Sequence, residues 1–318
     1  MNFILKRILS ALITLFLVSI LCFLAFSVIK GDPASGLGGI WTSPEQIETL
    51  REEMGLNRNV FVRYFDWLFK FLSGNTGVSY GFQGIQISEL ISQRFPVTIA
   101  LALLSLFLII IISFSVSLFT VKKQGSIADT IVNVITAGGI SAPGFFLGLL
   151  FIFIFGFGFK LFIPGNFINY NENFFGFLGS LFFPALAIAI PNSAILIKFL
   201  RSSLFNELQS DYVRTARSKG AGRLYIICNH VLKNACLPAI TILGMIIAEV
   251  FSGSIIIEQV FTIPGIGRLL IAAISSRDYP LIQSLMVYIA FIVVLANTLA
   301  DIINMSMDPR INQTRNVR

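Results

Sequence analysis

Few residues in this chain of 318 amino acids could do chemistry, and most of them stand in one short stretch. The sequence "DYVRTARSKG" (211–220) carries one acid and three bases and ends on a glycine, between two apolar runs. Glu249 and Asp301 lie within apolar runs, and His230 is the single histidine. A carboxylate inside a membrane span is costly and therefore marks a candidate functional residue, but no acid, base and nucleophile stand together here.

The sequence lacks the motifs of common catalytic and nucleotide-binding sites. Neither GxxxxGKS nor GxxxxGKT occurs, so the chain has no P-loop of its own for ATP, and HExxH is also absent. Cys22, Cys228 and Cys236 form no CxxC or Cys/His cluster, which argues against a disulfide framework and a structural zinc site. We therefore expect no catalytic residue, no metal site and no cofactor on this chain.

The composition indicates a membrane protein. Hydrophobic residues make up 55% of the chain and charged residues 12%, and the mean hydropathy is +0.83, whereas a soluble domain has about 25% charged residues. Apolar runs long enough to cross a bilayer as helices cover residues 8–29, 97–120, 131–157, 179–200, 237–261 and 284–305. These long blocks predict an all-α membrane protein of six transmembrane helices.

The net charge of +7 follows the predicted topology. If both termini are cytoplasmic, the cytoplasmic segments hold fourteen bases and four acids, and the opposite segments nine bases and ten acids. Because loops rich in Lys and Arg stay in the cytoplasm, we predict a multi-pass protein with both termini cytoplasmic and no nucleic-acid partner. The first run follows Lys6 and Arg7 and is long enough to be retained as a span, unlike the apolar core of a cleaved signal peptide.

The predicted spans divide the chain into four parts. Residues 1–29 form the N-terminus and first transmembrane helix, and 30–96 form an extracytoplasmic helical segment. Residues 97–306 form a five-helix core whose main cytoplasmic loop covers 201–236, and 307–318 form a cytoplasmic tail.

The segment 30–96 is too patterned to be a linker. Ser43 and Gln46 are placed to form a capping box around Pro44 at the first position of a helix. Aromatic and apolar residues on one face of "FVRYFDWLFKFL" (61–72) suit a helix at a membrane interface. A small helical cap is expected, either as a structural plug or with a role toward substrate.

Three residues within the spans are candidates for a translocation pathway. Pro143 follows small residues that let helices approach closely. Asn192 stands beside a proline, and such a kinked, polar helix can line a pathway or serve packing alone. Glu249 is the third candidate, and the alternative for it is a protonated side chain bonded to a neighbouring helix.

The charged stretch at 211–220 predicts a short helix displayed on the cytoplasmic loop. Ser210 can cap its start, Asp211 complements the helix dipole, and Gly220 can take the left-handed position that ends a helix. A helix of about nine residues is unstable alone in water, so its apolar residues must be held while its bases face an acidic partner. The alternative is a solvated basic loop.

The same region resembles a known family. The stretch 211–241 is similar to the signature loop of permease subunits of ATP-binding-cassette (ABC) importers, of the oligopeptide, dipeptide and nickel type. Further motifs similar to the first permease of that family stand at 31–34, 50–68, 255–270, 277–280 and 307–311. The general ABC-importer loop opens with Glu-Ala-Ala where this chain has Arg214, Thr215 and Ala216, a substitution common in the peptide and nickel branch.

The resemblance implies a type I importer permease in the bacterial cytoplasmic membrane. Its loop would be a coupling helix that docks in a groove of an ATPase, through Asp211, Tyr212, Arg214, Thr215, Ala216, Arg217, Lys219 and Gly220. The implied partners are a second homologous permease, two cytoplasmic ATPases that bind ATP and magnesium, the lipid bilayer and an extracytoplasmic solute-binding protein. The residues expected to face that binding protein are Arg268, Arg277, Asp278 and Tyr279.

The implied cargo is a di- or oligopeptide, with nickel or another metal–chelate complex as the alternative. A bare divalent ion would need a cage of His, Cys or carboxylate ligands that the predicted pore lacks. A secondary transporter is a more distant alternative, because it would need an internal repeat and interrupted helices. A membrane-embedded enzyme would need acids or histidines clustered at one membrane face.

Overall fold

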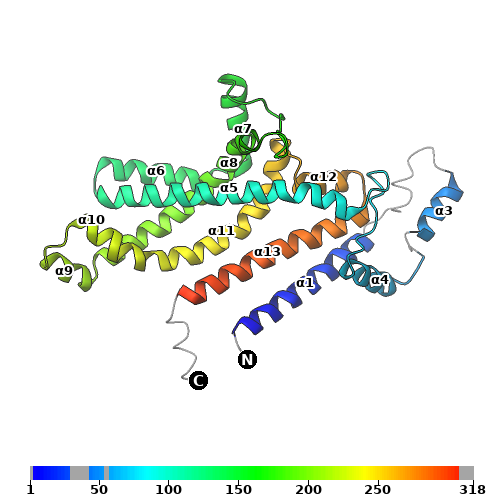
Figure 1. Cartoon of the computed structure of the whole chain (residues 1–318), viewed down its shortest axis with the longest axis horizontal. Coiled ribbons are helices and arrows are strands. Elements are labelled where there is room, and N and C mark those ends of the chain that lie inside the picture. The colour runs from blue at the N-terminus through cyan, green and yellow to red at the C-terminus, as the bar shows by residue number, and fades with distance from the viewer. Residues whose placement is uncertain (1–2, 29–42, 54–56, 308–318) are drawn as a thin grey trace. The chain divides into compact units, whose positions relative to one another are not determined.

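The computed structural model describes residues 3–28, 43–53 and 57–307 (Figure 1). Within these ranges the chain is helical and has no β-strand, and one isolated β-bridge pairs Val78 with Gln86. The motif at 31–34 and the predicted tail after residue 307 lie outside the described residues.

Five helical stretches of the described chain are long and apolar enough to cross a membrane. They lie in α1 (Phe3–Val28), α5 (Ile87–Lys122), α8 (Phe174–Leu208), α13 (Tyr279–Met307) and the continuous run of α10 (Arg223–Ile226), η2 (Ile227–Val231) and α11 (Leu232–Val260). The prediction of an all-helical chain with several potential spans is confirmed.

The predicted span at 131–157 is sharply bent in the structure. Helix α6 (Ile127–Ser141) is followed by α7 (Gly144–Phe151) and the π-helix η1 (Ile152–Gly158), and the axis bends by 102° between them. Ala142 is extended and Pro143 is the N-cap of α7, as expected because a proline disfavours the helical conformation of the residue before it. Alone, α6 is about 22 Å long, shorter than the hydrocarbon core of about 30 Å. The described chain has six potential spans only if the bent pair counts as one.

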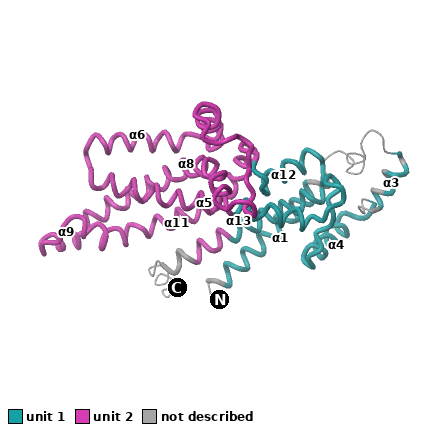
Figure 2. Tube along the Cα trace, turned by 45° about the horizontal axis from the view of Figure 1, so that its top comes forward, with its two compact units in different colours: residues 1–99, 263–295 teal, residues 100–262, 296–318 magenta. Residues whose placement is uncertain are grey.

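The chain divides into two compact units, which Figure 2 colours separately: residues 1–99 with 263–295, and residues 100–262 with 296–318. The first contains α1, α3 (Pro44–Glu53), α4 (Val60–Leu72), α12 (Ile266–Ser275) and the beginnings of α5 and α13. Its core is formed by apolar residues of α5, α12 and α13: Ile87, Leu90, Ile91, Ile266, Leu269, Leu270, Ala273, Leu281, Ile282 and Leu285. Helix α12 thus contributes to the core of this unit.

Two helix starts in this first unit depend on side-chain caps. The predicted capping box is confirmed, because the Ser43 N–H donates to Gln46 Oε1 (3.0 Å) and the Gln46 N–H to Ser43 Oγ (3.3 Å). At the start of α12, the Ile266 N–H donates to Thr98 Oγ1 (2.9 Å). Helix α5 begins at Ile87 and runs through Pro96 without ending.

In the second unit, α8 packs against α6, α7 and α11. A Cβ added to Gly139 would lie 3.0 Å from Ala194 Cβ, and one added to Gly144 would lie 3.3 Å from the Ala187 carbonyl oxygen. These approaches confirm that the small residues of the third predicted span let helices pack closely. Pro191 has no N–H to donate to the Ala187 carbonyl, so that oxygen faces Gly144 without its helical partner.

Candidate functional site

The charged stretch forms helix α9 (Asp211–Ser218), as predicted. Its end is a Schellman motif, in which the Gly220 N–H donates to Arg217 O (2.9 Å) and the Ala221 N–H to Ala216 O (3.2 Å). Gly220 has φ +80°, a conformation that a side chain would strain. Ser210 occupies the N-cap position, but its side chain makes no capping hydrogen bond.

One side of α9 is held by the rest of the second unit. Val213 is 1% exposed, and the Tyr212 hydroxyl donates to Glu207 Oε2 in α8 at 2.6 Å. Burial, followed by the hydrogen bond to the Glu207 carboxylate, raises the pKa of Tyr212. The phenol therefore remains protonated and can donate this bond at neutral pH.

The opposite side of α9 presents positive charge to solvent. Arg214, Arg217 and Lys219 are all exposed. Arg214 lies 3.6 Å from Asp211, but the two side chains are 78% and 96% exposed, and an ion pair in water contributes less than about 1 kcal/mol. These bases are therefore available to an acidic partner.

The loop around α9 is also attached to a second long helix. Arg223 Nη2 donates to the Val121 carbonyl oxygen in the last turn of α5 at 3.0 Å. Carbonyls in the last turn of a helix have no donor within that helix, so this bond stabilises the end of α5. The loop is thus bonded to α8 through Tyr212 and to α5 through Arg223.

An ion pair between α6 and α8 is a feature that the sequence did not predict. Asp129 Oδ1 lies 2.7 Å from Arg201 Nη2, and the side chains are only 11% and 13% exposed. Asp129 Oδ2 also accepts from the Gly125 N–H (3.1 Å), and Arg201 Nη1 donates to the Asn133 amide oxygen. The sequence marked Asp129 and Arg201 only as separate cytoplasmic charges, because no local pattern pairs residues so far apart.

One face of α11 is exposed along the length of the helix. Its exposed residues recur at helical spacing and include five polar side chains: Asn234, Pro238, Thr241, Met245, Glu249, Ser252, Ile256 and Gln259. Glu249 lies mid-helix, and its carboxylate makes no hydrogen bond or ion pair within the described chain. Because a carboxylate facing hydrocarbon costs several kcal/mol, this face suits water or a protein neighbour better than lipid.

The other two pathway candidates have different surroundings. Pro143 is exposed at the start of α7. Asn192 is 6% exposed; its Nδ2 donates to Ile188 O at 2.9 Å, and its Oδ1 has no hydrogen-bond partner in the described chain. No hydrogen bond joins any two of the three candidates, and Glu249 is the one that lies on an exposed polar face.

The four residues expected to face a binding protein are also differently placed. Asp278 is fully buried, and its carboxylate accepts from Ser79 Oγ, the Gly81 N–H (2.9 Å) and the Leu281 N–H (3.3 Å). Its side chain thus joins the loop before α5 to the start of α13 and does not present itself to a partner in this structure. Arg277 is exposed, and Arg268 and Tyr279 are partly exposed.

Known transport proteins match nearly all of the chain. The family model described as "Binding-protein-dependent transport system inner membrane component" matches residues 117–313, and the model for the N-terminal part of such membrane components matches residues 1–102. The chain belongs to this family. The permease is thus a multi-pass inner-membrane subunit of an ABC importer, of the peptide-transport branch, and such permeases carry no ATPase site of their own.

Relatives of the permease match along its whole length. A putative peptide transport system permease protein of Brucella abortus is 34% identical over 308 residues, and a probable peptide ABC transporter permease protein of Sinorhizobium fredii is 33% identical over 309 residues. The oligopeptide transport system permease protein AppB of Bacillus subtilis is 34% identical over 311 residues. Each alignment covers 97% of the permease and 98% of the relative.

Proposed function

We propose that this permease forms half of the translocation pathway of an ATP-driven importer for di- and oligopeptides. The observation that carries the proposal is α9, a short helix with exposed bases whose loop is bonded to two long helices. A second homologous permease would supply the other half of the pathway. An extracytoplasmic binding protein would deliver the peptide.

In this proposal α9 is the coupling helix. Two cytoplasmic ATPases, which bind the ATP and magnesium, would each receive such a helix in a surface groove. Arg214, Arg217 and Lys219 would meet acidic residues there, while Val213 stays buried within the permease. Movement of the ATPases would then shift α9 as a rigid body and switch the pathway between inward and outward access.

The exposed face of α11 is proposed to line the pathway. The second permease would cover this face across a water-filled space, which provides the polar surroundings that Glu249 needs. Mixed polar and apolar side chains along the face suit the mixed chemistry of peptides. Pro143 and Asn192 are secondary candidates, because Pro143 lies at a helix break and Asn192 is buried between helices.

The topology and remaining contacts complete the proposal. Both termini would be cytoplasmic, following the excess of Lys and Arg in the loops that this topology places inside. The binding protein would meet the outer surface near the exposed Arg277 and the partly exposed Arg268 and Tyr279.

The names of the relatives favour peptides as cargo, because the three described above are named for peptide or oligopeptide transport. Nickel or another metal–chelate complex remains the alternative cargo for the same role. A secondary transporter is the distant alternative and would work without ATPase partners.

Uptake by a reconstituted system tests this proposal. The permease would be placed in proteoliposomes with the second permease, ATPases and binding protein encoded beside it, and labelled peptides would be compared with nickel supplied with and without histidine. ATP-dependent peptide uptake is expected. Uptake of the nickel complex alone would establish the alternative cargo, and uptake without ATPases would support a secondary transporter.

A charge-reversal variant tests the coupling helix separately. Arg214→Glu/Arg217→Glu is expected to abolish uptake and co-purification of the ATPases. The control Lys122→Glu/Lys123→Glu reverses two exposed charges at the end of α5 and is expected to retain both. If the two variants behave alike, α9 is a solvated loop and not the coupling contact.

A further inference from the structure

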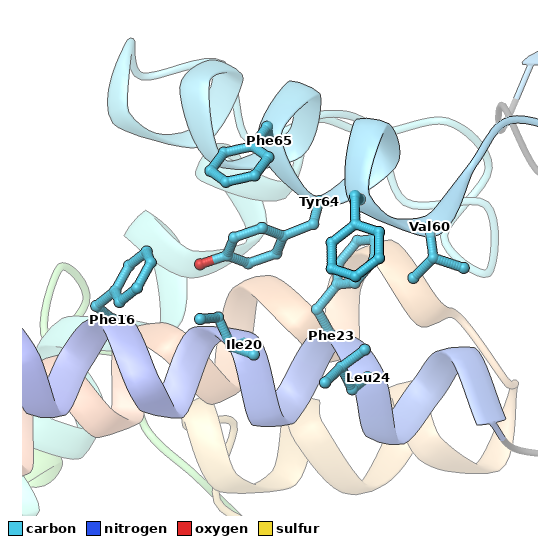
Figure 3. Close-up of a pocket in the computed structure, with 8 residues that line it drawn as sticks. Phe16, Ile20, Phe23, Leu24, Val60, Tyr64 and Phe65 are labelled. Carbon is cyan, nitrogen blue, oxygen red and sulfur yellow. The ribbon is translucent and has the colours of Figure 1, made fainter.

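A hollow of about 150 Å³ lies between α1 and α4, within the first unit (Figure 3). Its walls are apolar side chains from these two helices alone, among them Phe16, Ile20, Phe23, Val60, Tyr64 and Phe65. Figure 3 shows the Tyr64 ring reaching from α4 toward Ile20 on α1. Its hydroxyl is engaged with Ser19 Oγ at 2.8 Å, so the hollow offers no polar group to a ligand. Apolar cavities of this size exclude water and accept apolar molecules.

The surface beside the hollow is apolar as well. On α4, Phe61, Phe65, Phe69 and Leu72 form one stripe and are between 47% and 73% exposed. The other side of α4 is packed, because Tyr64 is buried and the Phe71 ring lies 5.4 Å from the Tyr288 ring. On α1, a candidate span, Phe16 and Leu24 are also more than 40% exposed. A helix with such a stripe lies stably in a membrane surface.

Positive charge lies on the side of α4 opposite this apolar stripe, and one base reaches a ring that lines the hollow. The Arg63 guanidinium carbon lies 5.8 Å from the centre of the Phe23 ring, which lines the hollow. Lys70 follows two turns later on the same side of α4 and is exposed. The one acid of α4, Asp66, is paired with Arg58 at 3.2 Å. Within the described chain, Arg63 and Lys70 therefore have no carboxylate partner.

We propose that the hollow between α1 and α4 binds an acyl chain of a membrane phospholipid, whose phosphate contacts Arg63 and Lys70. The apolar walls match the chain, and the two bases match the phosphate that is attached to it. Under the proposed topology this end of α1 is extracytoplasmic, so the lipid belongs to the outer leaflet. With the lipid bound in this way, α4 lies in the membrane surface, and the acyl chain fills the gap between α4 and α1.

Trp67 reports on this site directly. Its ring centre lies 6.1 Å from that of Phe23 and 6.2 Å from that of Tyr64, both of which line the hollow. The chain has only two tryptophans, so Trp41→Phe leaves Trp67 as the sole indole fluorophore. The full-length variant would be placed in phosphatidylcholine nanodiscs containing a minor fraction of phosphatidylglycerol brominated near the headgroup end of its chains. We expect this lipid to quench the fluorescence of Trp67 strongly and aqueous iodide to quench it weakly.

Three further variants distinguish a defined site from general contact with the bilayer. Ile20→Phe fills the hollow and is expected to lower quenching at least twofold, whereas Leu12→Phe, on α1 but outside the hollow, leaves it unchanged. Arg63→Gln/Lys70→Gln is expected to weaken quenching by brominated phosphatidylglycerol. Equal effects of Ile20→Phe and Leu12→Phe would overturn the lipid site. Strong quenching by iodide would show that α4 lies in water, and weak quenching by both agents would show that protein covers it.

Discussion

Asp129 and Arg201 form a largely buried ion pair at 2.7 Å that joins the first turn of α6 to α8. Further hydrogen bonds, from Gly125 to Asp129 and from Arg201 to Asn133, hold both side chains in place. The pair fixes α6 against α8 independently of the apolar contacts between these helices.

Removing one member of this pair should destabilise the permease. Asp129→Asn leaves the Arg201 charge buried without its partner, at a cost of about 3 kcal/mol. Thermal unfolding of the purified protein would show a lower Tm. The double variant Asp129→Asn/Arg201→Gln is expected to regain part of the loss, since no buried charge remains. A Tm unchanged by Asp129→Asn would show that the pair contributes little.

The end of α9 should depend on Gly220. In Gly220→Ala, the side chain strains the positive φ by about 1 to 2 kcal/mol, so amides of 211–221 should exchange hydrogen about tenfold faster. Gly222 is the matched control, because its φ of −64° suits any residue and no atom lies within 4 Å of an added Cβ. Equal exchange in the Gly220→Ala and Gly222→Ala proteins would contradict the Schellman ending.

The link between Tyr212 and Glu207 should be insensitive to pH in the neutral range. Because the folded state raises the pKa of Tyr212, the stabilisation is fully present below the unfolded pKa of about 10. It is lost as the pH rises through the higher folded value. Tyrosinate absorbance would be measured as the pH is raised, in the native protein and in Tyr212→Phe. The difference between the two curves isolates Tyr212 and should show that it ionises above the ordinary tyrosine pKa. A difference titration below the ordinary tyrosine pKa would contradict the hydrogen bond to Glu207.

Glu249 should favour positively charged cargo if the face of α11 lines the pathway. A carboxylate attracts an ammonium group by about 1 kcal/mol at contact in water, so Glu249→Gln should lower uptake of a basic peptide about fivefold relative to a neutral one. Met245→Gln, one turn away on the same face, controls for a changed surface. Equal losses for basic, neutral and acidic peptides would show that Glu249 does not select by charge.

Local patterns predicted α9, its glycine ending and the capping box at Ser43 correctly, because each depends on residues within one or two turns. The sequence could not reveal that Asp278 is buried and hydrogen-bonded by Ser79 and Gly81, since these residues come from a distant loop. Hydropathy likewise identified the apolar run at 131–157 but not its bend, which depends on the backbone at Ala142 and Pro143. The structure therefore differs from the sequence-based predictions where a residue has a partner distant in the chain or where the helix backbone breaks.

The contact between Gly144 and the Ala187 carbonyl has a mechanical consequence for α8. The turn that ends at Pro191 contains one hydrogen bond fewer than a regular turn, and only a glycine stands against it. Bending a helix is easiest where its hydrogen-bond ladder is already interrupted. Flexing of α8 during a transport cycle will therefore be easiest at this turn and at the turn that ends at Pro184, the other proline within the helix.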